Sequence, residues 1–178
     1  MPVSTIKTPL SLALGLCLTA TAASDADATE LMLAPGVTSG GETTANVSLA
    51  FDWNKRWFES ETGHLSGYWN VAYTWWEAGR FGSDEHSISV SPVLVYRFNA
   101  EGWEPFVELG VGAAYFSDDR VGDQRLGSRA HFEDRFAVGV QMNERDALRL
   151  RIIHYSNASL KEPNEGINSW SLVYSRRF

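Results

Sequence analysis

A histidine and a serine two residues apart, His154 and Ser156, are the side chains of this sequence that best combine for chemistry. In a serine hydrolase the hydroxyl attacks a carbonyl carbon, an imidazole removes its proton, and a third residue fixes the imidazole tautomer. Amides of Asn157, Asn164 or the loop backbone would stabilise the oxyanion. The spacing by itself is more typical of a polar rim residue and a cap at a strand end, so both interpretations stay open.

Most of the chain alternates between apolar and polar residues with a period of two, which predicts β-strands. Clusters of Gly, Asn and Asp separate the runs, and no good helical pattern competes with them. An even number of strands can close into an antiparallel barrel. The predicted strands are a weaker one at 30–38 and clear ones at 43–54, 64–75, 87–98, 104–117, 130–142, 146–156 and 169–178.

The strands carry their charged residues on the face opposite the apolar one, where these residues can pair across a narrow lumen. The apolar face ends in Trp and Tyr, as at membrane interfaces, and strands of about 10 residues suit a membrane barrel. We predict an all-β fold, an eight-stranded antiparallel transmembrane β-barrel, with a lipocalin-like soluble barrel as the alternative. The predicted lumen residues are Glu104, Glu108, Glu133, Arg135, Arg149 and Arg151, and the predicted interface anchors are Trp69, Trp75, Trp76 and Trp170.

The pattern of residues 1–22 predicts a cleaved signal peptide, which leaves residues 23–178 for the barrel. Lys7 precedes an apolar stretch that is too short to span a bilayer, and small residues form a cleavage site at its end. An uncleaved N-terminal anchor is the alternative. The only cysteine, Cys17, lies in this segment, so the mature chain has no disulfide, Cys-ligated zinc or thiol nucleophile.

Charge and histidine placement argue against two kinds of partner. The formal net charge is −7 and no basic cluster stands out, which argues against a nucleic-acid partner. His64, His86 and His131 show no metal-ligand grouping, so we predict no metal site.

The links between the predicted strands alternate between short and long, as in outer-membrane barrels with short periplasmic turns and long extracellular loops. The link at 54–63 fits this scheme poorly, and RVGDQRLG at 120–127 is either an ordered loop that touches lipopolysaccharide headgroups or a solvated one. The alternation places the end of the 146–156 strand near the outer surface. The short links are 99–103 and 143–145, and the longer ones are 77–84, 117–128 and 157–166.

The parity of this strand places His154 and Ser156 on its apolar face, because side chains on one face repeat every two residues. In a membrane barrel they would look at lipid, where an unpartnered polar group is costly. Asn168 falls on the same outward face of the final strand, and Phe132 and Asp134 share that face of the preceding strand. A polar group gathered there would suit hydrolysis of an acyl ester.

Several motifs in order make the chain similar to the outer-membrane lipid A 3-O-deacylases, the PagL family. They are GYWNVAYTWWEAG, SVSPVLVYRF, RVGDQRLGS, FEDRFAVG and above all HYSNASLKEPNEGI, and they cover almost the whole mature chain. The resemblance implies an eight-stranded barrel in the Gram-negative outer membrane that removes the ester-linked 3-position acyl chain of lipid A, the lipid part of lipopolysaccharide, without a cofactor.

The resemblance also implies roles for single residues. Ser156 matches the nucleophile and His154 the general base, while Asn164 is an oxyanion candidate. Asn157 and the pair Phe132 and Asp134 match polar and site residues of the family motifs.

The third member of the family's Ser-His-Glu arrangement departs from the pattern. The family motif continues GIE, whereas this chain reads GIN and places Asn168 where the acid belongs. An amide can fix the tautomer of the imidazole but supplies no negative charge, and the change can cost about 10⁴-fold in turnover when the tautomer is lost. The residues that could substitute for the acid are Glu162, Glu165 and Asp134.

Two functions of different classes therefore stay open, a lipid A esterase and a catalytically weak or silent small barrel. An acyltransferase acting on the same lipid would use the same face but has no motif support. A homodimer is compatible with either function, and the sequence does not decide the oligomeric state.

Overall fold

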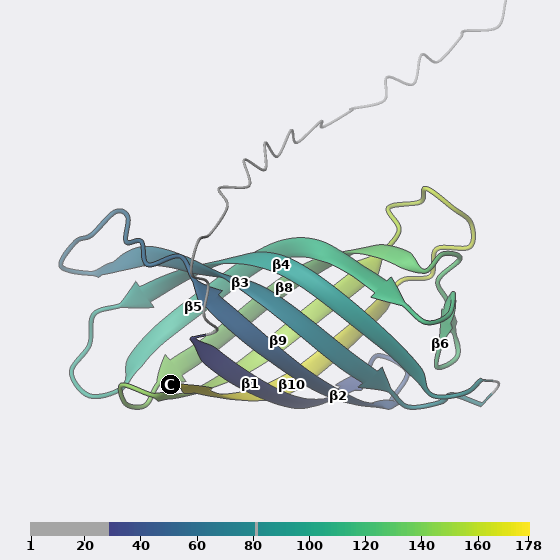
Figure 1. The fold of residues 1–178 in the computed structure, drawn as a ribbon, viewed down its shortest axis with the longest axis horizontal. Coiled ribbons are helices and arrows are strands. Elements are labelled where there is room, and N and C mark those ends of the chain that lie inside the picture. The colour runs from purple at the N-terminus through teal and green to yellow at the C-terminus, as the bar shows by residue number, and fades with distance from the viewer. Residues whose placement is uncertain (1–28, 81) are drawn as a thin grey trace, which may run out of the picture.

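Eight long strands close into an antiparallel barrel in the computed structural model, which describes residues 29–80 and 82–178 (Figure 1). The predicted signal peptide, residues 1–22, lies outside the described residues. The predicted fold class is confirmed, and the weak first strand has the predicted bounds. The long strands are β1 (Glu30–Thr38), β2 (Thr43–Asp52), β3 (Gly63–Trp76), β4 (Glu85–Phe98), β5 (Glu104–Phe116), β8 (Ala130–Gln141), β9 (Asp146–Ser156) and β10 (Ile167–Arg177).

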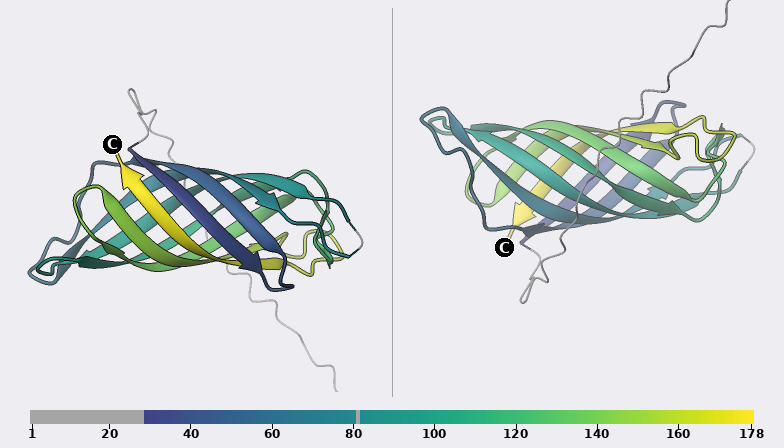
Figure 2. Two further views of the ribbon diagram at one scale, coloured as in Figure 1. Left: turned by 90° about the horizontal axis from the view of Figure 1, so that it is seen from below. Right: turned by 90° about the horizontal axis from the view of Figure 1, so that it is seen from above.

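The barrel closes because the first strand pairs with the last. The order around the wall is β1-β10-β9-β8-β5-β4-β3-β2, and Figure 2 shows β10 lying directly beside β1. Closure leaves no unpaired strand edge, as a wall that faces lipid requires. Within residues 29–80 and 82–178 no helix is long and apolar enough to cross a membrane.

Alternate residues of every strand point into the lumen, where the polar ones pair. Arg149 lies between two carboxylates, with its guanidinium 2.7 Å from Glu30 and 2.6 Å from Glu108. Arg135 contacts Glu133 at 2.6 Å. Buried charges need such partners. Glu104 shares the lumen face of β5 with Glu108 but is exposed, because it is the first residue of that strand.

The opposite residues form a continuous apolar outer wall, which includes Val71, Leu109, Val138 and Leu172. A soluble barrel would bury this face, so the lipocalin-like alternative is wrong.

One predicted interface anchor, Trp76, points inward. It is 1 % exposed, contacts the rings of Phe116 and Tyr155, and donates an indole hydrogen bond to Ser87 at 2.9 Å. Trp75 precedes it on the same strand, and neighbouring residues on a strand face opposite sides. The anchor prediction is therefore wrong for Trp76.

The two ends of the barrel differ. We call the end with the connections 77–84, 117–129 and 157–166 the outer end, and the end where β1 begins and β10 stops the inner end. The poorly fitting link 53–62 lies at the inner end, where it projects beyond the wall (Figure 1).

A small hairpin caps the outer end of the lumen. It consists of β6 (Arg120–Val121) and β7 (Gln124–Arg125), so RVGDQRLG is an ordered loop. Val121 and Leu126 are buried against a cluster that contains Trp76, Phe116 and Tyr155. Apolar burial of this kind drives the hairpin onto the barrel. The connection 157–166 lies beside this hairpin.

Candidate active site

The register of three neighbouring strands brings the predicted site residues into two rows on the outer wall. His154 on β9 lies opposite Asn168 on β10 and opposite Asp134 on β8. One row closer to the outer end, Ser156 lies opposite Phe132. Side chains directly opposite each other across strands have their Cβ atoms about 4.5–5.5 Å apart. Residues predicted from separate motifs therefore share one patch.

Asn168 holds the imidazole of His154. Its side-chain oxygen lies 2.8 Å from His154 Nδ1. An amide oxygen only accepts, so Nδ1 carries the proton and Nε2 presents its lone pair. This is the tautomer that a general base needs. The amide therefore orients the imidazole as a triad acid would, but it supplies no negative charge to stabilise the imidazolium.

Gly166 makes room for this ring just before β10 begins. Its φ is +64°, and a Cβ built there would lie 3.0 Å from His154 Cε1 and 3.6 Å from Nε2. A side chain at this position would be strained by the backbone and would press on the imidazole. Gly166 was not singled out from the sequence, although its place beside the NEGI motif was visible.

The amide of Asn164 is oriented by the backbone. Its Oδ1 accepts the Asn157 N–H at 3.0 Å, which leaves Nδ2 as the free donor end of the side chain. The side chain of Asn157 is buried, and its Nδ2 donates to the carbonyls of Leu126 at 2.9 Å and Lys161 at 2.8 Å. Asn157 thus ties the loop to the capping hairpin, a contact that a sequence pattern does not reveal.

The β6–β7 hairpin also forms hydrogen bonds with Glu165, one of the three carboxylates that could replace the missing acid. Glu165 accepts the Arg125 N–H at 2.5 Å, and its own N–H donates to the Arg125 carbonyl at 3.3 Å. Glu162 is exposed in the loop. Asp134 is exposed on the outer wall in the row of His154. Of the three, only Asp134 lies on a strand beside the imidazole.

An apolar groove runs along the outer wall below the two rows. Its volume is about 620 Å³, and its walls come from β8, β9, β10 and the C-terminal part of β1. Ile152 and Trp170 lie one row below His154 and Asn168 on the same face. The contribution of β1, at Pro35–Val37, was not predicted, because only barrel closure brings that strand beside β10.

The site holds no arrangement suited to a metal ion. Across residues 29–80 and 82–178 no group of three or more His, Cys, Asp or Glu side chains is placed to bind one.

Comparisons with known proteins agree with the fold and identify the family. The sequence profile of the family "Lipid A 3-O-deacylase (PagL)" matches residues 39–177. Lipid A deacylase PagL of Pseudomonas aeruginosa is 44% identical over 169 residues, which are 95% of this chain and 98% of that protein. Lipid A deacylase PagL of Bordetella bronchiseptica is 29% identical over 141 residues, covering 78% and 79%.

A solved structure gives the same result. The crystal structure of the outer membrane enzyme PagL superposes with a TM-score of 0.82 at 45% identity, covering 84% of this chain and 99% of that one. The profile match spans well over half of the chain. The chain belongs to the lipid A 3-O-deacylase (PagL) family.

Proposed function

We propose that this outer-membrane barrel hydrolyses the ester that joins the 3-position acyl chain to lipid A. One observation carries the proposal: His154, with Nδ1 bonded to the Asn168 oxygen at 2.8 Å, shares an outward strand face with Ser156, inside a chain of this family. A lipid substrate meets that face without leaving the membrane.

In the proposed reaction, Ser156 Oγ attacks the ester carbonyl while His154 Nε2 takes the hydroxyl proton. The tetrahedral intermediate collapses when the imidazolium returns this proton to the departing sugar oxygen, which leaves an acyl-serine. Water then attacks the acyl-serine, His154 again carries the proton, and a free fatty acid is released. No oxidant, metal or cofactor enters this balance.

The loop would stabilise the oxyanion, and the groove would hold the acyl chain. Asn164 Nδ2 is the proposed donor, since its Oδ1 is already engaged by the Asn157 N–H. Asn157 then acts as a positioning residue through the hairpin. The groove below the rows offers an apolar path for the chain, and Phe132 borders the serine on the other side.

Asp134 is our proposal for the charge that Asn168 lacks. The imidazolium that forms during the reaction has a neutral amide on β10 and a carboxylate on β8. Even without a direct hydrogen bond, a carboxylate one strand away stabilises that charge by Coulomb attraction. Asn168 would fix the tautomer of His154, and Asp134 would supply the negative charge that stabilises its imidazolium.

Mass spectrometry of lipid A from cells that express the chain tests the function. Loss of the 3-linked acyl chain with the natural chain and its retention with Ser156→Ala is the expected result. Ser159→Ala, in the exposed part of the same loop, is the matched control and should behave like the natural chain. Intact lipid A with a folded natural barrel would favour the silent-barrel alternative and overturn the proposal.

A homodimer stays a prediction. The mass of the protein–detergent complex, measured by light scattering, tests it, with a single barrel per micelle as the contradicting result.

A further inference from the structure

The inner end of the lumen contains a concentration of positive charge that the proposed reaction does not use. A cavity of about 360 Å³ opens there and is lined by four cationic side chains and one carboxylate. The cations are Lys55, Arg56, Arg97 and Arg177, and the carboxylate is Asp52. The chain as a whole carries a formal charge of −7, so this local excess departs from the average composition.

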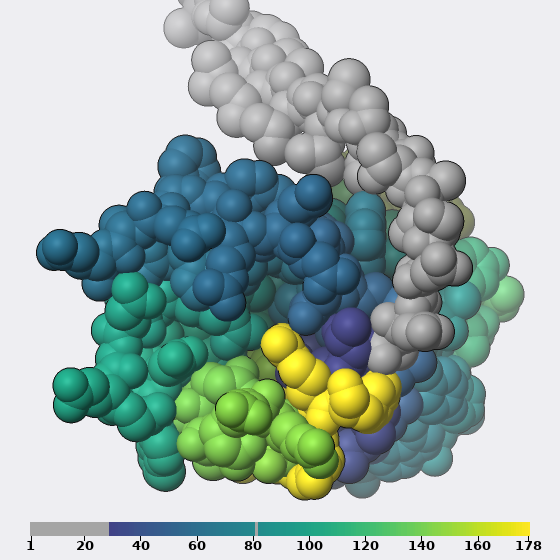
Figure 3. Space-filling view, turned by 60° about the vertical axis from the view of Figure 1, so that its left-hand side comes forward, coloured from purple at the N-terminus to yellow at the C-terminus, as the bar shows by residue number. Residues whose placement is uncertain are grey.

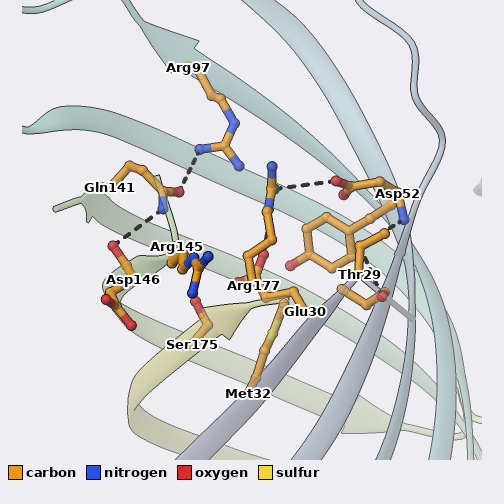
Figure 4. Close-up of polar contacts among 12 residues, drawn as sticks. Thr29, Glu30, Met32, Asp52, Arg97, Gln141, Arg145, Asp146, Ser175 and Arg177 are labelled. Carbon is orange, nitrogen blue, oxygen red and sulfur yellow. Dashed lines mark hydrogen bonds and ion pairs between the residues drawn. The ribbon is translucent and has the colours of Figure 1, made fainter. Parts of the chain in front are cut away.

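Two carboxylates at the cavity are already paired with arginines, while Glu59, Glu104 and Glu144 line the neighbouring cavity that shares some of these cations. Asp52 lies 3.3 Å from Arg177, and Glu30 is shared between Arg177 at 3.7 Å and Arg149 at 2.7 Å. Figure 4 shows the guanidinium groups of Arg97 and Arg177 pointing into the same space. Two like charges in one cavity repel unless an anion lies between them.

Arg97 is a half-buried cation of this cavity whose contacts are with neutral groups. Its Nη1 donates to Gln141 Oε1 at 3.2 Å, and its guanidinium stacks 5.3 Å above the Phe106 ring, both neutral partners. Within residues 29–80 and 82–178, no carboxylate lies within 4.0 Å of Arg97, Arg56 or Lys55. Arg177 Nε is buried and has no hydrogen-bond acceptor in the same part of the chain.

We propose that this cavity is a binding site for a phosphate group. Guanidinium groups present several N–H donors in a planar fork that matches the oxygens of phosphate, and His64 on the cavity wall adds a further donor or acceptor. The cavity is larger than an inorganic phosphate ion, so it also accommodates a phosphate ester.

Two sources of that phosphate reach the inner end. One is a soluble phosphate compound that enters the cavity mouth. The other is a phospholipid headgroup from the membrane leaflet at that end. Link 53–62, the blue lobe of Figure 3, favours contact with that leaflet, because Trp53 packs edge-on against Trp57 and Trp69 and Phe58 is 81% exposed.

Binding of inorganic phosphate and pyrophosphate to the purified barrel in nonionic detergent tests the proposal. Titration calorimetry should give saturable binding that Arg97→Gln weakens at least tenfold. Arg145→Gln, exposed in a turn at the same end and not on the cavity wall, should bind like the natural chain. Arg97→Lys keeps the charge without the fork and should give intermediate affinity, which provides a readout if Arg97→Gln does not fold.

Phosphatidylglycerol added to the micelles separates the two sources. Competition with pyrophosphate identifies the headgroup as an occupant, and unchanged pyrophosphate binding identifies a soluble phosphate compound. Absence of saturable binding by all three probes, or equal binding by Arg97→Gln and the natural chain, would overturn the proposal. Neither result bears on deacylation, because the cavity lies at the opposite end of the barrel from Ser156.

Discussion

Replacing Asp134 with Asn should slow deacylation by about 10- to 100-fold without unfolding the barrel. Asp134 and His154 are directly opposite on β8 and β9, so their charges lie roughly 6 Å apart when the imidazole is protonated. At an effective dielectric constant of about 20 this attraction is worth about 2.8 kcal/mol, or about 100-fold in rate. Exposure of Asp134 weakens it toward the lower limit.

Two further variants separate charge from shape at this position. Asp134→Glu keeps the charge and should retain most of the activity. Asn168→Glu, added to Asp134→Asn, places a carboxylate against Nδ1 and should restore the lost rate. At a charge separation of about 4 Å its attraction is worth about 4 kcal/mol, an upper limit near 10³-fold.

The assay is release of the 3-linked fatty acid from lipid A in mixed micelles. With the carboxylate gone, the imidazolium that forms in the transition state is less stable, so the turnover of Asp134→Asn should fall. With Asn168→Glu added, turnover should recover. An Asp134→Asn barrel that releases the fatty acid at the rate of the natural chain would refute the electrostatic role.

Three other substitutions test the packing around the site and the lumen. Gly166→Ala should reduce turnover at least tenfold, since its Cβ would lie 3.0 Å from His154 Cε1, whereas Gly41→Ala, where a Cβ meets nothing within 4 Å, should leave turnover unchanged. Asn157→Ala removes two side-chain hydrogen bonds that tie the loop down, so it should lower turnover about tenfold and speed tryptic cleavage of the loop; equal cleavage rates would contradict this tie. Arg149→Met leaves the buried Glu108 without an ion pair and Glu30 with only Arg177 at 3.7 Å, so it should lower the free energy of unfolding in urea by about 3 kcal/mol; an unchanged midpoint would contradict the pairing.

The alternation of residues was sufficient to predict the strands, the barrel and the outward direction of His154 and Ser156, because a two-residue period fixes the face of each side chain. The prediction of Trp76 as an interface anchor was wrong because it followed residue type, whereas the alternation, with Trp75 facing lipid, places Trp76 inside. The hairpin β6–β7 was not predicted as strands, because segments of two residues carry no period.

The site could be predicted as a set of residues but not as an arrangement. Asp134, His154 and Asn168 occupy one row only because of the register between β8, β9 and β10, and register depends on the pairing of whole strands. The same holds for the loop. Asn157 and Asn164 look alike in the sequence. Only their hydrogen-bond partners show that Asn157 fixes the loop to the hairpin, whereas the Nδ2 of Asn164 is left as a donor.

Strand β9 contributes to both sides of the wall. Its odd-numbered residues, among them Arg149 and Tyr155, lie inside, and its even-numbered residues His154 and Ser156 lie outside. Every substitution inside the barrel on this strand is thus one peptide unit away from the esterase face. Interior substitutions on β9, for example to widen the lumen into a channel, would therefore also shift His154 and Ser156. Interior and surface of this strand have to be redesigned together.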